Sequence, residues 1–496
     1  MRTPYLQSGS GATRRWLLGC SAVGVVALGY CLIALTATAA PANPEARITV
    51  HPERPGVAIP ADFLGFSCEK KILSIECFQP RNLVLINLFR NLGSGVLRIG
   101  GNEVESAFWS RTETNPPSSM RNIGYSLKPL TLGPPALDNL YGFAKQSGWR
   151  VIHGLNLGAN NPAMAADEAA YALQVGGPRV LALEVGNEPN LYPKSATRSG
   201  LRPHNYGYAQ YRAEVESYNR AILTRLPHAP LAGPATTKTC KWLPDYVADF
   251  KPHLVLATSH VYPLSAKEEN PQSPRFASVE NLLGANTEGD WLPQLQASTA
   301  AGIPFRLGEC NSASGGGKPG VSDTFASALW AVDFLFDVAG HGGAGVNLHG
   351  AFGKTGGYSP FCFRNNGYLA CPIYYGMLLF HQAAVGRVVP TECETSRNIT
   401  AHAVLGTDRK LRVVLVNKDL TNPVVASIVS GSPRARAEVI RLAAPSATSR
   451  EGVTLAGGAV AEDGTWAPQP GEMVPCVNGR LEVSLPAASA ALLTIE

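Results

Sequence analysis

Short apolar runs alternate with longer amphipathic segments between about residues 60 and 386. The apolar runs place hydrophobic side chains at consecutive positions, which is typical of parallel strands buried on both faces. Helix-like segments follow them, as at 208–226 and at 322–340, where Ser322 and Asp323 provide a predicted helix cap. The eight strand candidates cover residues 63–69, 95–101, 149–158, 180–189, 230–236, 254–263, 304–311 and 343–350. Eight strand–helix units predict an α/β fold, a closed (β/α)₈ TIM barrel.

The pattern changes after about Val389, where strand-like runs separated by turns replace the strand–helix alternation. These runs cover residues 411–419, 423–431, 436–444 and 480–496. They predict an antiparallel β-sandwich. The extended segment 46–60 precedes the first barrel strand, and we expect it to pair into this sandwich. The predicted domains are a barrel over 60–386 and an accessory β-sandwich built from 45–59 and 387–496.

The first 39 residues have the features of a signal peptide. Arg14 and Arg15 precede an apolar run at 16–35, and the sequence "ATA" at 37–39 fits a cleavage site. The two arginines also resemble a twin-arginine export signal. The apolar run is about 20 residues long and can span a bilayer, so an uncleaved anchor is the alternative. We therefore expect an exported protein, secreted or periplasmic, which stays membrane-anchored if this segment is retained.

Composition narrows the classes of partner. Removing the N-terminal segment lowers the net charge from +5 to +2, because that segment holds three arginines and no acids. A nearly neutral chain argues against a nucleic-acid partner. Eight cysteines remain, and they permit disulfides such as Cys362–Cys371 or Cys393–Cys476 without fixing the connectivity. No pair of cysteines and no histidine cluster has the spacing of zinc ligands, so we predict no metal. We also predict no cofactor, and we expect a monomer.

Two carboxylates carry the candidate chemistry. Glu188 and Glu309 end the fourth and seventh predicted strands, and barrel active sites lie at these strand ends. One such Glu alone is more often a surface or capping residue, but a pair suits glycoside hydrolysis. One carboxyl protonates the leaving oxygen, and the other attacks the anomeric carbon when the two are about 5–5.5 Å apart. Arg98 and Tyr262 can keep Glu309 ionised, while His260 is either a supporting residue or a core histidine.

Several segments resemble glycoside hydrolase family 79, which contains heparanase and microbial β-glucuronidases. The sequence "GNEP" at 186–189 matches the acid/base motif of a large clan of retaining glycosidases. Residues 305–335 are similar to the family's nucleophile segment, and 97–102, 154–173 and 374–386 are similar to other family segments. The resemblance covers roughly residues 60–386 and implies a barrel with an attached β-sandwich.

The resemblance assigns the general acid/base to Glu188 and the nucleophile to Glu309. It implies that Asn187 bonds the sugar 2-hydroxyl and that the backbone at 314–316 holds a substrate carboxylate. The assigned substrate contacts are Glu69, Asn102, Asn187, Tyr262, Ser314, Gly315, Gly316 and Tyr358. Ser314 stands where the family has a tyrosine, so an aromatic contribution to the pocket is absent at that position. Glycines suit the role, because backbone N–H groups can approach an anion where no Cβ intervenes.

The resemblance implies an exported retaining exo-β-glucuronidase acting on oligosaccharides or glycoconjugates. It would release terminal β-linked glucuronic acid or its 4-O-methyl form. An endo-β-glucuronidase of heparanase type, acting on heparan sulfate, is the first alternative. An enzyme that cleaves within a sulfated polymer needs a cleft lined with Lys and Arg, and residues 267–275 form no dense basic run. The insert at 110–135 could instead close off the site, which would enforce exo cleavage. A non-catalytic carbohydrate-binding barrel is the second alternative, and the presence of both carboxylates speaks against it.

Overall fold

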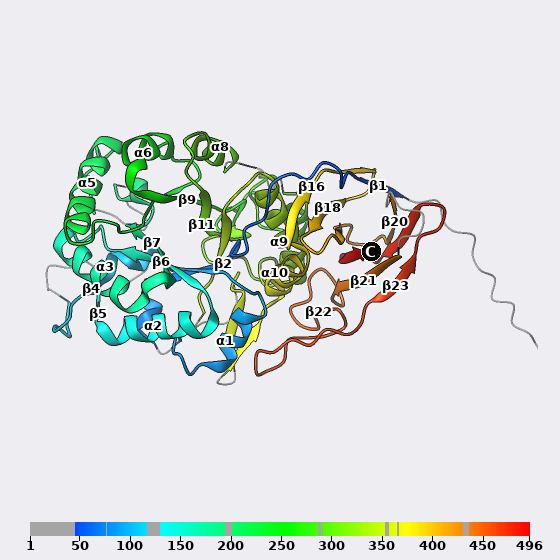
Figure 1. Cartoon of the computed structure of the whole chain (residues 1–496), viewed down its shortest axis with the longest axis horizontal. Helices are drawn as coiled ribbons and strands as arrows, with labels where there is room; N and C mark the ends of the chain where they lie inside the picture. Colours follow the sequence, from blue (N-terminus) through cyan, green and yellow to red (C-terminus); the bar gives the residue numbers. More distant parts are fainter. Residues whose placement is uncertain are drawn as a thin grey trace, which may run out of the picture. The chain divides into compact units, whose positions relative to one another are not determined.

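Eight parallel strands close into a barrel in the computed structural model (Figure 1). The strands are β2 (Leu64–Glu69), β3 (Val96–Gly100), β6 (Arg150–Leu155), β7 (Val180–Val185), β8 (Leu231–Thr237), β9 (Leu254–Val261), β11 (Phe305–Cys310) and β13 (Gly345–His349). They follow one another around the barrel in chain order, and β13 pairs with β2 to close it. Their side chains are almost all buried, which explains the continuous apolar runs. The predicted (β/α)₈ barrel is confirmed.

The structure describes residues 45–75, 77–116, 129–193, 201–285, 289, 291–352, 357–364, 367–429 and 436–496. The predicted signal peptide at 1–39 lies outside these residues, as does part of the insert at 110–135. Within the described ranges, no helix is both long and apolar enough to cross a membrane. The eight cysteines in these ranges are all free thiols, including both candidate disulfide pairs.

Helices surround the barrel and cover its outer face (Figure 1). They are α1 (Leu83–Arg90), α2 (Pro134–Ser147), α3 (Pro162–Gly176), α5 (Tyr208–Arg225), α6 (Leu243–Phe250), α7 (Val279–Leu283), α8 (Leu292–Ala300), α9 (Phe325–Gly340) and α10 (Pro372–Ala383). Capping residues determine where several of these helices begin or end. Asn161 caps α3 by accepting a hydrogen bond from the Met164 amide, and Gly148 ends α2 in a left-handed conformation.

The predicted cap of the helix at 322–340 is wrong. Helix α9 begins at Phe325, after Thr324. The Ser322 hydroxyl and the Asp323 carboxylate accept hydrogen bonds from amides of the preceding loop instead. Residues of this type can bond the backbone of a turn as well as that of a helix, so sequence alone did not decide between the two.

The C-terminal region and the N-terminal strand β1 (Ala46–Val50) form two packed sheets. One sheet has the order β17-β1-β20-β24, and the other has the order β16-β18-β19-β25-β21-β22, with β23 beside β21. These strands are β16 (Gly386–Val389), β17 (Thr391–Thr395), β18 (Ile399–Gly406), β19 (Leu411–Asn417), β20 (Val424–Val429), β21 (Arg436–Ala443), β22 (Thr454–Leu455), β23 (Glu472–Pro475), β24 (Arg480–Leu485) and β25 (Ser489–Ile495). The sandwich built from both ends of the described chain is confirmed.

Two details of the sandwich differ from the prediction. The run at 480–496 is not one strand, because β24 and β25 belong to different sheets and residues 486–488 turn between them. The sandwich is also not wholly antiparallel, since β1 pairs antiparallel with β17 but parallel with β20. Parallel pairing is possible because β1 joins the sheet from a distant part of the chain and needs no tight turn.

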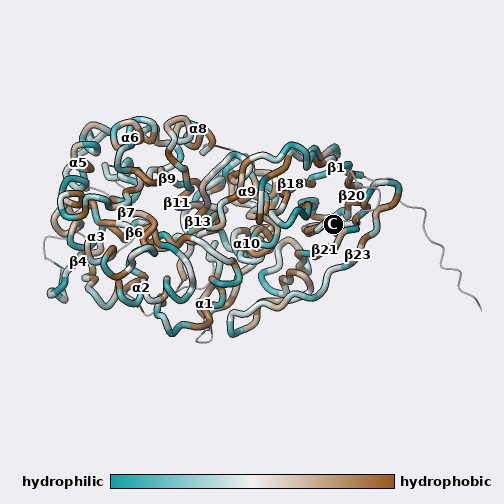
Figure 2. The backbone as a smooth tube through the Cα atoms, in the orientation of Figure 1, coloured by the Kyte–Doolittle hydropathy of each residue, from teal (hydrophilic) through white to brown (hydrophobic). Residues whose placement is uncertain are grey.

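Helices α9 and α10 pack between the barrel and the sandwich. Both are hydrophobic along most of their length (Figure 2), as expected of helices buried on all sides. Helix α9 also carries a buried charge, Asp333, whose carboxylate accepts hydrogen bonds from Thr400 at 2.6 Å and from Lys418 at 2.6 Å. Buried charge must be paired, so these bonds fix where the sandwich strands meet the helix.

Candidate active site

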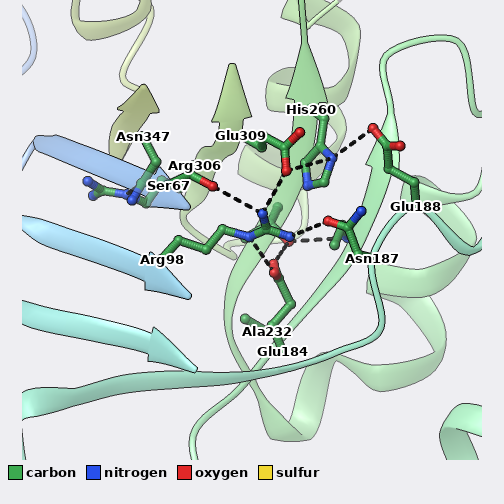
Figure 3. Close-up of polar contacts among 12 residues, drawn as sticks. Ser67, Arg98, Glu184, Asn187, Glu188, Ala232, His260, Arg306, Glu309 and Asn347 are labelled. Atoms are coloured by element: carbon green, nitrogen blue, oxygen red, sulfur yellow. Dashed lines mark hydrogen bonds and ion pairs between the residues drawn. The ribbon is translucent and has the colours of Figure 1, made fainter. Parts of the chain in front are cut away.

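Arg98, on β3, lies fully buried among the residues at the barrel mouth (Figure 3). Its guanidinium donates to Glu184 at 2.6 Å, to Asn187 at 2.8 Å, to Glu309 at 3.0 Å and to the Ser67 hydroxyl at 3.2 Å. One cation is thus shared by two carboxylates from β7 and β11. Burial by itself would lower the pKa of Arg98, but these two carboxylates outweigh it and raise the pKa.

Glu309, on β11, is surrounded by groups that favour its ionised form. Its Oε1 accepts a hydrogen bond from the Tyr262 hydroxyl at 2.9 Å, and its Oε2 lies 3.7 Å from His349 Nδ1 and 3.9 Å from His260 Nδ1. Burial alone would raise the pKa of Glu309. The charges of His349, His260 and Arg98 outweigh burial, so the pKa is held well below its usual range. A carboxylate kept ionised in a buried site is suited to act as a nucleophile.

Glu188 does not belong to the strand that precedes it. Strand β7 ends at Val185, whereas the sequence pattern predicted a strand through 189. Gly186 has φ +80°, and Glu188 itself is left-handed with φ 46° and ψ 55°. The Glu188 amide donates to the Ala235 carbonyl at 2.8 Å, on the next barrel strand. A tight turn, rather than strand alternation, therefore sets the direction of the Glu188 side chain.

His260 lies between the two candidate catalytic carboxylates (Figure 3). Its Nδ1 is 3.0 Å from Glu188 Oε1 and 3.9 Å from Glu309 Oε2. One oxygen of Glu188 and one of Glu309 lie within 4.8 Å of each other and of a His260 nitrogen. This separation is close to the roughly 5–5.5 Å of retaining glycosidases and shorter than the roughly 6.5–9.5 Å of inverting ones.

The same three side chains are the candidate cation ligands within the described ranges. Glu309 already accepts a hydrogen bond from the Arg98 guanidinium, and that positive charge would oppose a bound cation. The arrangement therefore suits acid/base and nucleophilic chemistry better than metal binding.

Three predicted sugar contacts lie on one side of the mouth, at the ends of β2, β3 and β7. Asn187 donates to Asn102 Oδ1 at 3.3 Å, and Arg98 holds the other end of the Asn187 amide. Gly101 has φ +68°, and a Cβ at this position would overlap the Glu69 carboxylate. The glycine therefore lets Glu69 lie against the backbone before Asn102.

The glycine-rich loop follows β11, the strand that carries Glu309. Ser314 belongs to β12 (Ala313–Ser314), which pairs with β10 (Leu264–Ser265) just after Tyr262. A Cβ on Gly317 would come within 2.7 Å of the Tyr358 amide nitrogen, so the loop packs closely on the segment after β13. The rings of Tyr358 and Tyr262 stack with centroids 6.0 Å apart. The structure thus brings together the loop, Tyr358 and the hydrogen-bond partner of Glu309.

Sequence reasoning gave no role to Glu184 or His349. The signal for Glu184 was present, because a carboxylate inside the apolar run 181–185 needs a buried cation. His349, at the end of β13, is likewise a buried titratable residue that needs a partner. Burial by itself would lower its pKa, but the carboxylates of Glu309 and Glu69 outweigh burial and raise the pKa. Which cation or carboxylate each would meet was not readable from the sequence.

Comparisons with known proteins fit the barrel with its attached sandwich. Residues 401–492 match the glycosyl hydrolase family 79 C-terminal beta domain. A β-glucuronidase of Neurospora crassa is 26% identical over 298 residues, which cover 53% of this chain and 52% of that protein. Heparanase of Mus musculus is 26% identical over 307 residues, which cover 59% of this chain and 52% of that protein. The chain therefore resembles glycoside hydrolase family 79.

The family 79 resemblance seen in the motifs is thereby confirmed. A solved structure of a 4-O-α-L-rhamnosyl-β-D-glucuronidase from Fusarium oxysporum superimposes with a TM-score of 0.73 at 21% identity. The match covers 90% of this chain and 100% of that one, and it shows the shared fold. The chain spans about half the length of the curated relatives it matches.

Proposed function

We propose that this protein is a retaining β-glucuronidase in which Glu188 is the general acid/base and Glu309 the nucleophile. The observation that carries the proposal is the close approach of the two carboxylates, within 4.8 Å, in unlike surroundings. Glu309 bonds the Arg98 guanidinium, whereas Glu188 bonds His260 and lies on a turn at the mouth. Retaining glycosidases need such a pair with divided roles.

The proposed reaction has two steps. Glu309 attacks the anomeric carbon while Glu188 protonates the departing glycosidic oxygen, which leaves a glycosyl ester on Glu309. Glu188, now a carboxylate, then removes a proton from water as the water attacks the same carbon and displaces Glu309. Tyr262 donates a hydrogen bond to Glu309 Oε1. Oε2 of Glu309 accepts a hydrogen bond from Arg98. Both oxygens of the proposed nucleophile are therefore oriented before the substrate binds.

The proposed sugar is β-linked glucuronic acid or its 4-O-methyl form. Two relatives are β-glucuronidases by name. In this chain the backbone at 314–317, rich in positive-φ glycines, lies beside Tyr262 and Tyr358 and can present N–H groups to the sugar carboxylate. The proposed partner of the sugar 2-hydroxyl is Asn187, whose side-chain amide bonds Arg98 and Asn102.

We further propose exo action on terminal residues by an exported, monomeric enzyme. The segment at 267–275 has two cations and two anions in nine residues, which gives no basic track for a sulfated polymer. Export rests on the features of residues 1–39. Size analysis of the products of a long uronic-acid polymer separates the modes: exo action releases monosaccharide alone, and any early oligosaccharide supports the endo alternative.

Sugar selectivity tests the proposal directly. We expect hydrolysis of a nitrophenyl β-glucuronide and a roughly 10⁴-fold lower kcat/KM on the matching β-glucoside, because a site built for a polar group strongly disfavours an analogue that lacks it. Proton NMR of the first product should show the β-anomer. Equal rates on both sugars would refute the glucuronidase assignment, and an initial α-anomer would refute retention.

The pH profile tests the electrostatic role of Arg98. We expect Arg98→Lys to move the acidic limb of kcat/KM upward by roughly one pH unit, since a lysine ammonium cannot keep all four guanidinium contacts. The lowered pKa of Glu309 keeps this carboxyl ionised as pH falls. Weakening that charge pairing raises the pKa, so protonation inactivates the variant at higher pH than the wild type.

Arg306→Lys is the matched control for this prediction. Arg306 is an equally buried arginine on β11, but its guanidinium donates to Asn347 and to backbone carbonyls such as that of Phe63. The variant should lose stability and leave the acidic limb in place. An unmoved limb in Arg98→Lys, or an equal shift in both variants, would contradict the assigned role.

A further inference from the structure

Glu105 is a buried carboxylate that joins three loops at the barrel mouth. It lies in the short helix η2 (Asn102–Ser106), after β3, and its side chain has no exposed surface. It accepts hydrogen bonds from the Asn187 amide at 2.9 Å, from the Gly158 amide and from the Tyr192 hydroxyl. These donors come from the loops after β6 and β7. One carboxylate therefore connects the ends of three neighbouring strands.

The turn that carries Glu188 is held from both sides. Glu105 binds the backbone amide of Asn187, directly before Glu188, and the hydroxyl of Tyr192, directly after the short helix η4 (Pro189–Leu191). The Glu188 amide itself bonds Ala235 on the opposite side. A left-handed non-glycine residue costs on the order of 1–3 kcal/mol and persists only where its surroundings over-determine it.

The donors around Glu105 match the acceptor oxygens of a carboxylate. An ionised carboxylate is acceptor-only, with about four lone-pair sites, so it can satisfy several converging donors at once. A glutamine would turn an NH₂ group toward at least one of these N–H or O–H donors. The shape of the side chain would be kept while the hydrogen bond to that donor was lost.

We propose that Glu105 is a positioning residue that fixes the Glu188 carboxyl in line with the departing oxygen of the substrate. It acts through the Asn187 amide and Tyr192 rather than by touching the sugar. The inference rests on the proposed role of Glu188 as acid/base. Its consequence is specific: loss of Glu105 impairs proton donation and leaves nucleophilic attack by Glu309 largely intact.

The test compares leaving groups in Glu105→Gln. We expect kcat/KM to fall about 10- to 100-fold on an alkyl β-glucuronide, whose poor leaving group needs the proton, since misplacement of about 1 Å can cost roughly 10²-fold. On a dinitrophenyl β-glucuronide, which departs without protonation, the loss should stay under about threefold. Tyr192→Phe removes one donor to Glu105, keeps the ring, and should show the same pattern at smaller size.

Glu214→Gln is the matched control. The Glu214 carboxylate, on α5, bonds Arg202 at 2.7 Å and Tyr206 at 2.9 Å in the same loop region. Any loss in this variant should be equal for both leaving groups. Equal losses on both substrates in Glu105→Gln, or wild-type rates on both, would overturn the inference. If Glu105→Gln does not fold, Tyr192→Phe decides by the same comparison.

Failure of the glucuronidase assignment can be distinguished from failure of the proposed role of Glu105. A wild type that hydrolyses aryl glucosides but not glucuronides would refute the sugar assignment, and the leaving-group comparison on glucosides would still decide the role of Glu105. A wild type inactive on every aryl and alkyl glycoside would overturn both proposals together.

Discussion

Glu309→Gln should lower kcat/KM on a nitrophenyl β-glucuronide on the order of 10⁴- to 10⁶-fold, the scale of losing a catalytic nucleophile. A neutral amide cannot attack the anomeric carbon, so the loss should be equally large for good and poor leaving groups. The amide also no longer balances the Arg98 guanidinium, which then keeps Glu184 as its carboxylate partner. Initial rates across leaving groups, with thermal unfolding to confirm a folded variant, measure the effect.

Trapping the intermediate identifies the nucleophile without a substitution. A 2-fluoro dinitrophenyl β-glucuronide slows both steps but keeps a good leaving group, so the glycosyl-enzyme should accumulate. Mass spectrometry of the digested protein should then find one added sugar on the peptide that contains Glu309. An adduct on another peptide, or Glu309→Gln turnover near that of the wild type, would reject Glu309 as nucleophile.

Glu188→Gln should show the opposite dependence on the leaving group. We expect a loss of roughly 10²- to 10⁴-fold on an alkyl β-glucuronide, because general acid catalysis contributes on this scale. On a dinitrophenyl β-glucuronide the first step needs no proton, so the glycosyl-enzyme should form quickly. It should then persist, since in the proposed mechanism Glu188 is also the base that activates water in the second step.

Azide provides the control for Glu188→Gln. As an anion it needs no base, so it should speed turnover of the variant and give a β-glucuronosyl azide, while leaving Glu309→Gln inactive. A loss that is uniform across leaving groups, with no response to azide, would show that Glu188 is not the acid/base. Glu105→Gln should lie between Glu188→Gln and the wild type on the same leaving-group series, because it displaces the acid without removing it.

The hydrophobic pattern predicted some strand boundaries well and others poorly. The strand candidates at 254–263 and 304–311 match β9 and β11 closely. The predicted strand at 180–189 is too long, because β7 ends at Val185. The pattern of apolar residues does not reveal that Gly186 and Glu188 have positive φ angles. The pattern at 480–496 predicts one strand for a similar reason: the turn at 486–488 consists of proline and alanine, so no polar residue separates the two strands.

The candidate site was predicted in part. Glu188 and Glu309 follow from strand order, since strands four and seven of a closed barrel end at the same mouth. The partners of these carboxylates did not follow. Glu105 lies in a short segment between elements, and nothing local distinguishes its carboxylate from a surface acid. Its burial results from three loops closing over it, which is a property of the assembled mouth.

The sequence by itself determined the barrel, the added sandwich and the strand ends that carry the two carboxylates, because hydrophobic runs and their spacing are local properties of the chain. Only the tertiary structure decided what surrounds those carboxylates. Arg98 meets Glu184 across 86 positions and Glu309 across 211. His260 meets Glu188 across 72. Contacts between residues so far apart depend on strand register and loop closure around the whole barrel, and these give the two carboxylates their different surroundings.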